Sequence, residues 1–204
     1  GLLSAPAGAY TIKGDWDGPG QNPVTIKYYF ANTTSDMWWW QQQLEIWRAM
    51  FIWQKYADIT FVPAGAAGQS QSIDFGFYTG NHGDGSNFDG EGGILSHAFY
   101  PPPFTAEPRA GDVHFDDAED WASPDRSLYS AALHEIGHAL GLDHSTDTKS
   151  VMYSTFSGGS FGIGLCPDDI AAIRAIYAPK YPALIANISG THQWRSDLEI
   201  RIGV

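Results

Sequence analysis

The sequence predicts an α+β fold in which a five-stranded, twisted mixed sheet packs with three α-helices. Short β-rich runs alternate with longer stretches whose apolar residues recur every three or four positions. The chain of 204 residues, with 43% hydrophobic and 14% aromatic content, is also large enough to bury a full core. We expect one helix behind the sheet and a second helix beneath it.

Five short segments are expected to form the strands. Val24–Phe30 and Ile59–Val62 are rich in β-branched and aromatic residues. Ile73–Tyr78 alternates apolar residues with polar or small ones, as a half-buried strand does. Two shorter strands, Ile94–Phe99 and Asp112–Phe115, could face each other across a glycine-rich loop.

The first helix is expected between the first two strands, at Met37–Tyr56. Its apolar residues recur at three- and four-residue spacing, which predicts an amphipathic helix. The triple tryptophan Trp38–Trp40 could form a sugar-stacking platform, although aromatic residues at helical spacing more often pack against protein. The residues that carry the spacing are Trp40, Leu44, Trp47 and Phe51.

Two more helices are expected in the second half of the chain. The first covers about Ser127–Leu140. The other runs from Pro167 to Tyr177, where Asp168 and Asp169 are placed to cap its N-terminus.

The stretch HEIGHALGLDH carries three potential metal ligands. In a helix, His134 and His138 are four residues apart and project from one face, so two imidazoles can share one ion. Gly141 can adopt the left-handed conformation that ends a helix and lets the chain turn back, which brings in His144. Three protein ligands leave one tetrahedral position open, as in a catalytic zinc site. Beside the first histidine, the carboxylate of Glu135 could accept a proton from zinc-activated water, which predicts a metal-assisted hydrolase.

A second set of histidines lies upstream. His97 and His114 fall on the two short strands, and His82 and Asp84 fall on the glycine-rich loop. Three imidazoles and one carboxylate would fill a tetrahedral zinc site with no open position, and a closed site is structural.

The acidic residues near this second set suggest calcium. In Asp89-Gly-Glu-Gly-Gly-Ile94, the glycines allow a loop to fold its carbonyls around an ion, and Asp116 and Glu119 could close the site.

These motifs resemble a known family of peptidases. The pattern HExxHxxGxxH followed by Met152 is the metzincin signature of zinc endopeptidases. Residues 10–178 resemble the matrixin branch, with Ser145 after the third histidine and the block from His82 to Asp116 matching in order. The resemblance implies a metzincin fold, with the active-site cleft between the sheet's edge strand and the catalytic helix.

The resemblance also implies roles for individual residues. It implies one catalytic and one structural zinc, and a peptide substrate lying antiparallel to the strand Ile94–Phe99. A substrate pocket after the scissile bond would accept leucine, methionine or a similar residue, with Ser130 setting its depth and Ser154, Thr155 and Phe156 forming its wall. One calcium would be held by Asp89, Gly90, Gly92, Ile94, Asp116 and Glu119, and a second would use Asp74 and Asp112.

Composition excludes some partners. A net charge of −12, a pI near 4.7 and the absence of a lysine- and arginine-rich run argue against nucleic acid. No apolar run is long enough to span a membrane, and we expect a monomer. The single Cys166 cannot form an internal disulfide, so secretion is inferred from the calcium sites and the family resemblance. Gly1–Gly8 is too short and uncharged for an intact secretory signal, which suggests a processed form.

The chain changes character near residue 179. Residues 1–178 are expected to form the catalytic domain, and residues 179–204 a connector with a C-terminal β extension. The run Ile188–Ile200 resembles the opening of the P domain found after proprotein-convertase domains, although a hairpin packed on the catalytic domain is a competing interpretation.

Taken together, the motifs and the family resemblance predict a secreted zinc endopeptidase. The alternatives are a metal-stabilised binding or adhesion module, for which Trp38–Trp40 is the only support, and a zinc hydrolase of non-peptide bonds.

Overall fold

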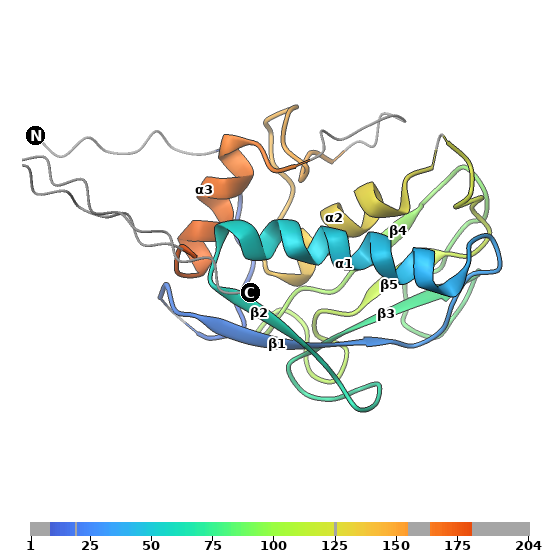
Figure 1. Cartoon of the computed structure of the whole chain (residues 1–204), viewed down its shortest axis with the longest axis horizontal. Helices are drawn as coiled ribbons and strands as arrows, with labels where there is room; N and C mark the ends of the chain where they lie inside the picture. Colours follow the sequence, from blue (N-terminus) through green and yellow to red (C-terminus); the bar gives the residue numbers. More distant parts are fainter. Residues whose placement is uncertain (1–8, 19, 125, 155–163, 181–204) are drawn as a thin grey trace, which may run out of the picture.

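The computed structural model describes residues 9–18, 20–124, 126–154 and 164–180, and it contains the expected five-stranded mixed sheet and three helices (Figure 1). The strand order is β2-β1-β3-β5-β4. The first four strands in this order run parallel, and β4 pairs antiparallel with β5 at the edge. The bounds are β1 Val24–Phe30, β2 Ile59–Pro63, β3 Ser72–Tyr78, β4 Ser96–Ala98 and β5 Val113–Asp116.

The sheet positions two predicted metal ligands. In the β4–β5 pair, His97 lies directly opposite His114. Side chains of directly paired residues project from the same face of an antiparallel sheet, so the two imidazoles can reach one ion. The expected strand Ile94–Phe99 shortens to three residues, because the glycine-rich loop continues up to it.

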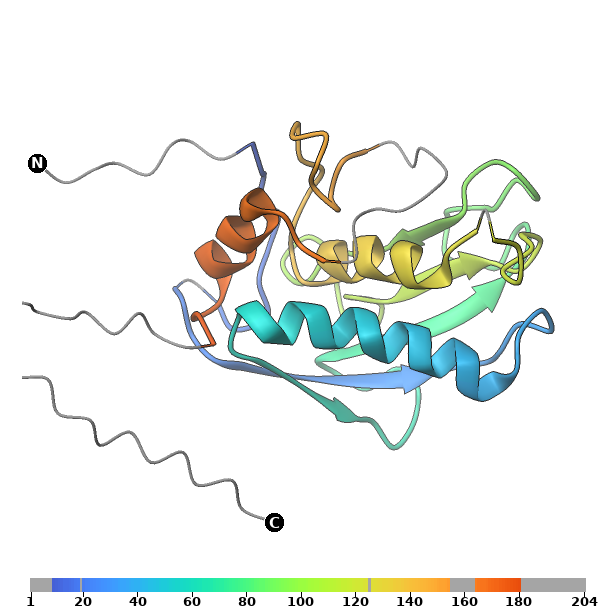
Figure 2. The same ribbon diagram turned by 45° about the horizontal axis from the view of Figure 1, so that its top comes forward.

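The helices are α1 (Trp39–Tyr56), α2 (Leu128–Ala139) and α3 (Pro167–Ile176). The expectation of one helix behind the sheet and one beneath it is wrong, because α1 and α2 lie side by side on the same face (Figures 1 and 2). The fully buried Trp53 of α1 joins them by donating from its indole N–H to the Leu133 carbonyl of α2 at 3.0 Å. Within the described residues, no helix is long and apolar enough to cross a membrane.

The buried face of α1 is not the apolar stripe from which the helix was predicted. The stripe of Trp40, Leu44, Trp47 and Phe51 is 42% to 64% exposed. The opposite stripe packs on the core, and the side-chain amide of Gln42 within it is hydrogen-bonded to backbone groups. The buried residues of α1 are Gln42, Ile46, Ala49, Met50 and Trp53.

Candidate active site

The helix α2 brings His134 and His138 onto one face. Its N-terminus is capped by Ser127, whose hydroxyl accepts a hydrogen bond from the Ser130 N–H at 3.2 Å. The Nδ1 atom of His134 lies 2.6 Å from the Val151 carbonyl, and that of His138 lies 2.7 Å from the Leu142 carbonyl. A carbonyl can only accept, so each Nδ1 carries a proton and each Nε2 presents a lone pair to the site.

These lone pairs fit a metal ion. The two Nε2 atoms are 3.1 Å apart, and two lone pairs at this distance repel unless a cation or proton lies between them. Burial and the neighbouring His134 lower the pKa of His138 to about 3, so its imidazole is neutral near pH 7. One nitrogen from each of His134, His138 and His144 lies within 4.8 Å of the others. Three neutral imidazole nitrogens are a donor set that zinc prefers.

The turn after α2 delivers His144 as predicted. Gly141 has φ of +106°, and a Cβ there would collide with the Gly14 carbonyl, so only glycine allows this turn. The N-terminal segment fastens the turn from outside, because the Lys13 N–H donates to the Gly141 carbonyl and the Asp143 N–H donates to the Thr11 carbonyl, both at 2.8 Å.

Sequence reasoning missed a polar network around this turn. The hydroxyl of Tyr100 donates to Asp143 at 2.9 Å, and the ammonium of Lys13 lies 3.2 Å from the same carboxylate. The Asp143 carboxylate also accepts from the His144 N–H at 2.9 Å, and the Tyr100 ring meets His138 edge-on at 5.5 Å between centroids. The network therefore links the third histidine to the N-terminal segment and to the loop after β4.

Met152 lies beneath the histidines. A Cβ on Gly137 would collide with the Met152 sulfur, so the glycine in the motif allows close packing of α2 on this turn. Asp169, at the start of α3, holds the turn through the Ser150 hydroxyl and through the Val151 N–H at 3.2 Å. The sequence predicted Asp169 only as a helix cap, a role it also has through the Cys166 N–H at 2.8 Å.

Glu135 is 5% exposed and faces the edge strand. Its Oε1 accepts a hydrogen bond from the Ser96 hydroxyl at 2.8 Å. Burial raises the pKa of Glu135 to about 7, opposed by the Ser96 hydrogen bond and by His97 and His144. Sequence reasoning missed Ser96, although the period-two alternation of a strand could have found it, since it places Ser96 on the face opposite His97.

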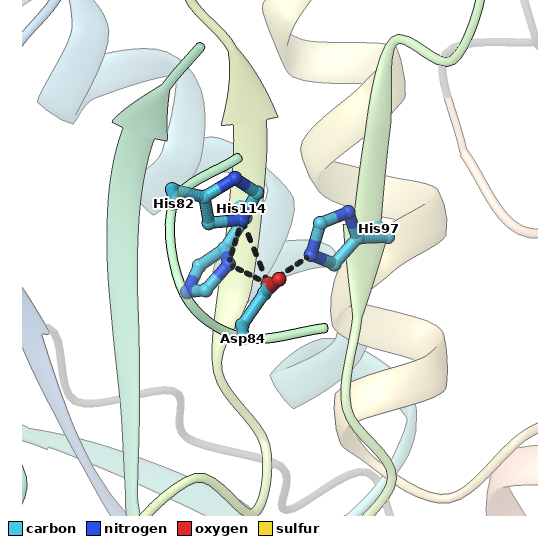
Figure 3. Close-up of side chains that lie close together, drawn as sticks. All are labelled: His82, Asp84, His97 and His114. Carbon is cyan, nitrogen blue, oxygen red and sulfur yellow. Dashed lines mark hydrogen bonds and ion pairs between the residues drawn. The ribbon is translucent and has the colours of Figure 1, made fainter. Parts of the chain in front are cut away.

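The second histidine cluster converges on one carboxylate oxygen (Figure 3). The Asp84 Oδ2 lies 2.7 Å from His82 Nε2 and 2.8 Å from both His97 Nε2 and His114 Nδ1. Burial alone would raise the pKa of Asp84, but hydrogen bonds from the Ser86 backbone and the three histidines hold it well below its usual range. Three nitrogens and one oxygen meeting at a point fit a closed tetrahedral zinc site.

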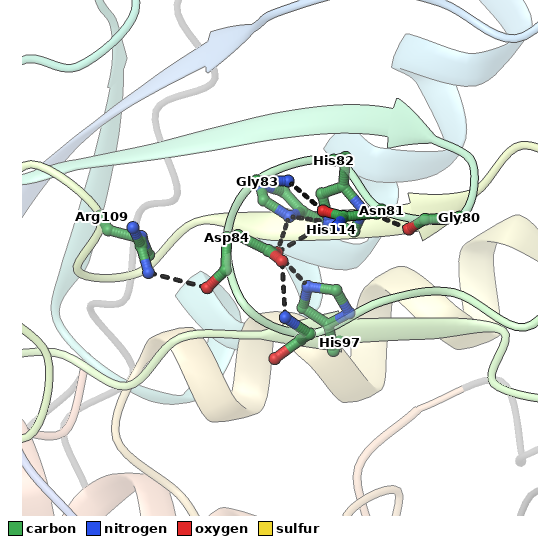
Figure 4. Close-up of polar contacts among 9 residues, drawn as sticks. Gly80, Asn81, His82, Gly83, Asp84, His97, Arg109 and His114 are labelled. Atoms are coloured by element: carbon green, nitrogen blue, oxygen red, sulfur yellow. Dashed lines mark hydrogen bonds and ion pairs between the residues drawn. The ribbon is translucent and has the colours of Figure 1, made fainter.

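Surrounding groups hold the predicted ligands of this second cluster in place (Figure 4). The His82 Nδ1 lies 3.0 Å from the Gly80 carbonyl, and the Arg109 guanidinium donates to the Asp84 carbonyl at 2.8 Å. The rings of Tyr78 and Phe88 both stack on His82 at 5.0 Å. Aromatic rings therefore shield the cluster, and its predicted ligands are held in fixed orientations.

The loop predicted to bind calcium folds against the predicted carboxylates. The Gly90 N–H donates to Asp116 at 3.2 Å, and the Gly92 N–H donates to Glu119 at 2.7 Å. The Ile94 N–H donates to Asp89 at 2.8 Å. All six predicted residues thus lie close together, and backbone N–H groups of the loop donate hydrogen bonds to oxygens of the three carboxylates.

Asp74 and Asp112, predicted for a second calcium, are also neighbours. The Asp74 N–H donates to the Asp112 carboxylate at 3.2 Å. Burial and the charge of Asp74 raise the pKa of Asp112 to about 7. A cation between the two carboxyl groups would relieve this repulsion.

The predicted pocket residues are only partly described. Ser130 is 4% exposed on α2, one turn before His134, and Ser154 is exposed after the methionine turn. Thr155 and Phe156 lie outside the described residues.

Comparison with known proteins agrees with this geometry. Residues 19–178 match the matrixin model of the peptidase M10 family. The chain is 42% identical over 164 residues to the hatching enzyme of Paracentrotus lividus, covering 76% of the chain and 25% of that protein. It is 42% identical over 159 residues to the interstitial collagenase of Bos taurus, covering 76% and 32%, and 36% identical over 170 residues to karilysin of Tannerella forsythia, covering 82% and 35%. The chain thus spans about a quarter to a third of the length of these relatives. It belongs to the matrixin family and carries the catalytic domain of a zinc metalloendopeptidase.

Proposed function

We propose that this protein hydrolyses internal peptide bonds of protein substrates, using His134, His138 and His144 to hold a catalytic zinc and Glu135 as general base. The observation that carries the proposal is the buried Glu135 carboxylate beside three converging imidazoles. A structural zinc site would need neither an open position nor a neighbouring base.

The residues divide the chemistry between them. Zinc, when bound, supplies a Lewis acid that makes water nucleophilic near neutral pH. Glu135 accepts the proton of the attacking water as the oxygen adds to the peptide carbonyl carbon. Glu135 then gives this proton to the amide nitrogen, so the carbon–nitrogen bond breaks and a neutral amine leaves. Ser96 orients the carboxylate by donating to Oε1.

The edge strand β4 offers a place for the substrate. Among the described strands it pairs with β5 alone, so the backbone groups of its other side would be available to an extended peptide. Since Ser96 contacts Glu135, a peptide lying antiparallel to β4 would bring its scissile bond to the base.

Specificity is proposed to come from a pocket after the scissile bond. Ser130 is small and lies one turn before His134, so it leaves space beneath the site. With Ser154, Thr155 and Phe156 as the wall, the pocket would accept leucine, methionine or a similar residue.

We propose two zinc ions and one or two calcium ions. The structural zinc would use His82, Asp84, His97 and His114. The first calcium would lie in the loop of Asp89, Gly90, Gly92, Ile94, Asp116 and Glu119, and a second would lie between Asp74 and Asp112. We also propose that the protein is exported from the cell and is a monomer. Residues 1–178 would form the catalytic domain, and residues 179–204 would form an extension. The run Ile188–Ile200, which resembles the start of a P domain, lies outside the described residues.

Cleavage-site mapping tests this proposal. The full chain is incubated with a peptide library, and the products are identified by mass spectrometry, with Glu135→Ala as the control. Cleavage before leucine-like residues, lost in the variant and blocked by a zinc chelator, would support it. A folded, zinc-loaded chain that cleaves nothing would favour the binding module, and Trp38–Trp40 would be its first candidate surface because these side chains are 49% to 71% exposed.

A further inference from the structure

The outer face of α1 carries an apolar stripe that the proposed chemistry does not use. Trp40, Leu44, Trp47 and Phe51 follow one another at helical spacing and are 49%, 44%, 42% and 64% exposed. Exposed large apolar residues are normal when scattered singly, but a continuous stripe marks an interaction surface. The inner face of α1 packs on the core, and the outer stripe contacts the sheet only at its border in the described residues, where the Trp47 ring meets Phe30 edge-on at 6.0 Å.

The stripe borders a groove between α1 and the start of α2. The groove has a volume of about 300 Å³. The Arg48 guanidinium lies over the Tyr129 ring at 4.8 Å, and it pairs with Glu45 at 2.7 Å, so the groove has one charge of each sign at its rim. The lining residues are Leu44, Trp47, Arg48, Phe51, Ile52 and Tyr129.

The end of the described chain packs against the last residue of α1 and the two residues that follow it. Pro179 bridges to Ala57, the Lys180 N–H reaches the Tyr56 carbonyl at 3.5 Å, and the Lys180 ammonium lies 3.5 Å from Asp58. The chain therefore leaves the described fold at the C-terminal end of α1. Phe51 lies about 7.5 Å along the helix axis from Tyr56, at ~1.5 Å per residue.

The sequence beyond this point has a face that needs covering. Leu198, Ile200, Ile202 and Val204 alternate with Glu199, Arg201 and Gly203, so a strand there would be apolar on one side and charged on the other. One or two strands are not stable alone in water and need an apolar surface to pack on. A few extended residues at roughly 3.3 Å each would bring the chain from Lys180 back to the groove.

We propose that the segment 183–204 docks on the outer face of α1 and fills this groove. Its apolar side chains would cover Leu44, Trp47 and Phe51. Glu199 and Arg201, on the other side of the strand, would face the solvent. The proposal does not depend on peptide cleavage, so the two can fail separately.

Paramagnetic labelling of the full chain tests the docking. In a Cys166→Ser background, a nitroxide is attached at Lys55→Cys, one turn from Phe51 on an exposed position. The control label is placed at Ala66→Cys, an exposed position on the loop between β2 and β3. The Lys55 label should broaden the methyl signals of Leu198, Ile200 and Ile202 by more than half, and the Ala66 label should leave them sharp.

Variants of the surface complete the experiment. Phe51→Glu should abolish the broadening, and Leu44→Glu provides a second test if the first variant does not fold. Phe104→Glu is a matched control, because Phe104 is 60% exposed on the loop after β4. Sharp signals in the folded Lys55-labelled chain, or broadening that persists in Phe51→Glu and Leu44→Glu, would overturn the proposal. If a chain without a nitroxide shows the broadening only when it is mixed with nitroxide-labelled chains, the occupant is a second copy, and this result would also overturn the proposal.

Discussion

The two histidine clusters use similar donors but are built in different ways. His134, His138 and His144 come from one helix and the turn that follows it, and they leave a side open beside Glu135. His82, His97 and His114 come from a loop and two strands, and Asp84 closes the cluster. The first cluster is local and open, which suits chemistry. The second ties distant segments together, which suits stability.

The largest expected effect tests the open side of the first cluster. Glu135→Gln keeps the size and the hydrogen bond with Ser96 but removes the base, so kcat/KM should fall roughly a thousandfold. Zinc content and unfolding temperature should not change. The measurement is peptide turnover with zinc quantified in the same sample, and a loss below tenfold would mean that another group is the base.

The second prediction concerns stability. His97→Ala leaves the buried Asp84 carboxylate without one partner and opens the closed cluster, so the free energy of unfolding should fall by about 3 kcal/mol. His144→Ala is the matched control, because His144 is exposed, and it should cost about 1 kcal/mol. Denaturant unfolding compares the two variants at equal total zinc. Equal losses would remove the distinction between the clusters.

A smaller effect is expected at Ser96, which begins β4 and donates a hydrogen bond to Glu135. Ser96→Ala removes a hydrogen bond to a carboxylate, so kcat should fall roughly tenfold while KM changes little. Ser96→Thr keeps the hydroxyl and should recover most of the rate. If both variants lose the same activity, the role of Ser96 is in the shape of the strand and not in positioning Glu135.

The smallest effect concerns Cys166, a free cysteine that belongs to neither cluster. Burial, together with the neighbouring Asp169 carboxylate, raises the pKa of Cys166 to about 11, because a thiolate is disfavoured there. Alkylation at pH 8 should therefore be roughly a hundredfold slower than for a free cysteine and should rise about tenfold per pH unit up to pH 10. Fast alkylation near pH 7 would show an activated thiol.

The sequence predicted the members of both clusters, but for different reasons. HExxH sets the spacing of two ligands and the base, and Gly141 sets the turn, because these depend on helical geometry alone. The closed cluster was predicted from the resemblance of the block from His82 to Asp116 to the matrixin family, and from the expectation that two short strands face each other. The Lys13, Asp143 and Tyr100 network joins three segments, and no local pattern reports such contacts.

The face of α1 shows another limit. Both stripes of α1 repeat at helical spacing, so periodicity predicts the helix but does not say which stripe is buried. Tertiary packing decides this, and it buries Ile46 and Ala49 completely while Trp47 and Phe51 stay exposed. A second apolar stripe on a helix is then a signal of another surface.

Stepwise zinc removal tests the contrast between the clusters most directly. A chelator is added in stages to the zinc-loaded chain, while zinc content, peptide turnover and near-ultraviolet circular dichroism are followed together. We expect the zinc of the open cluster to leave first, with complete loss of turnover and a retained tertiary signal, and the zinc of the closed cluster to leave later, with loss of that signal. Turnover that survives the first loss, or a tertiary signal that disappears with it, would contradict this account.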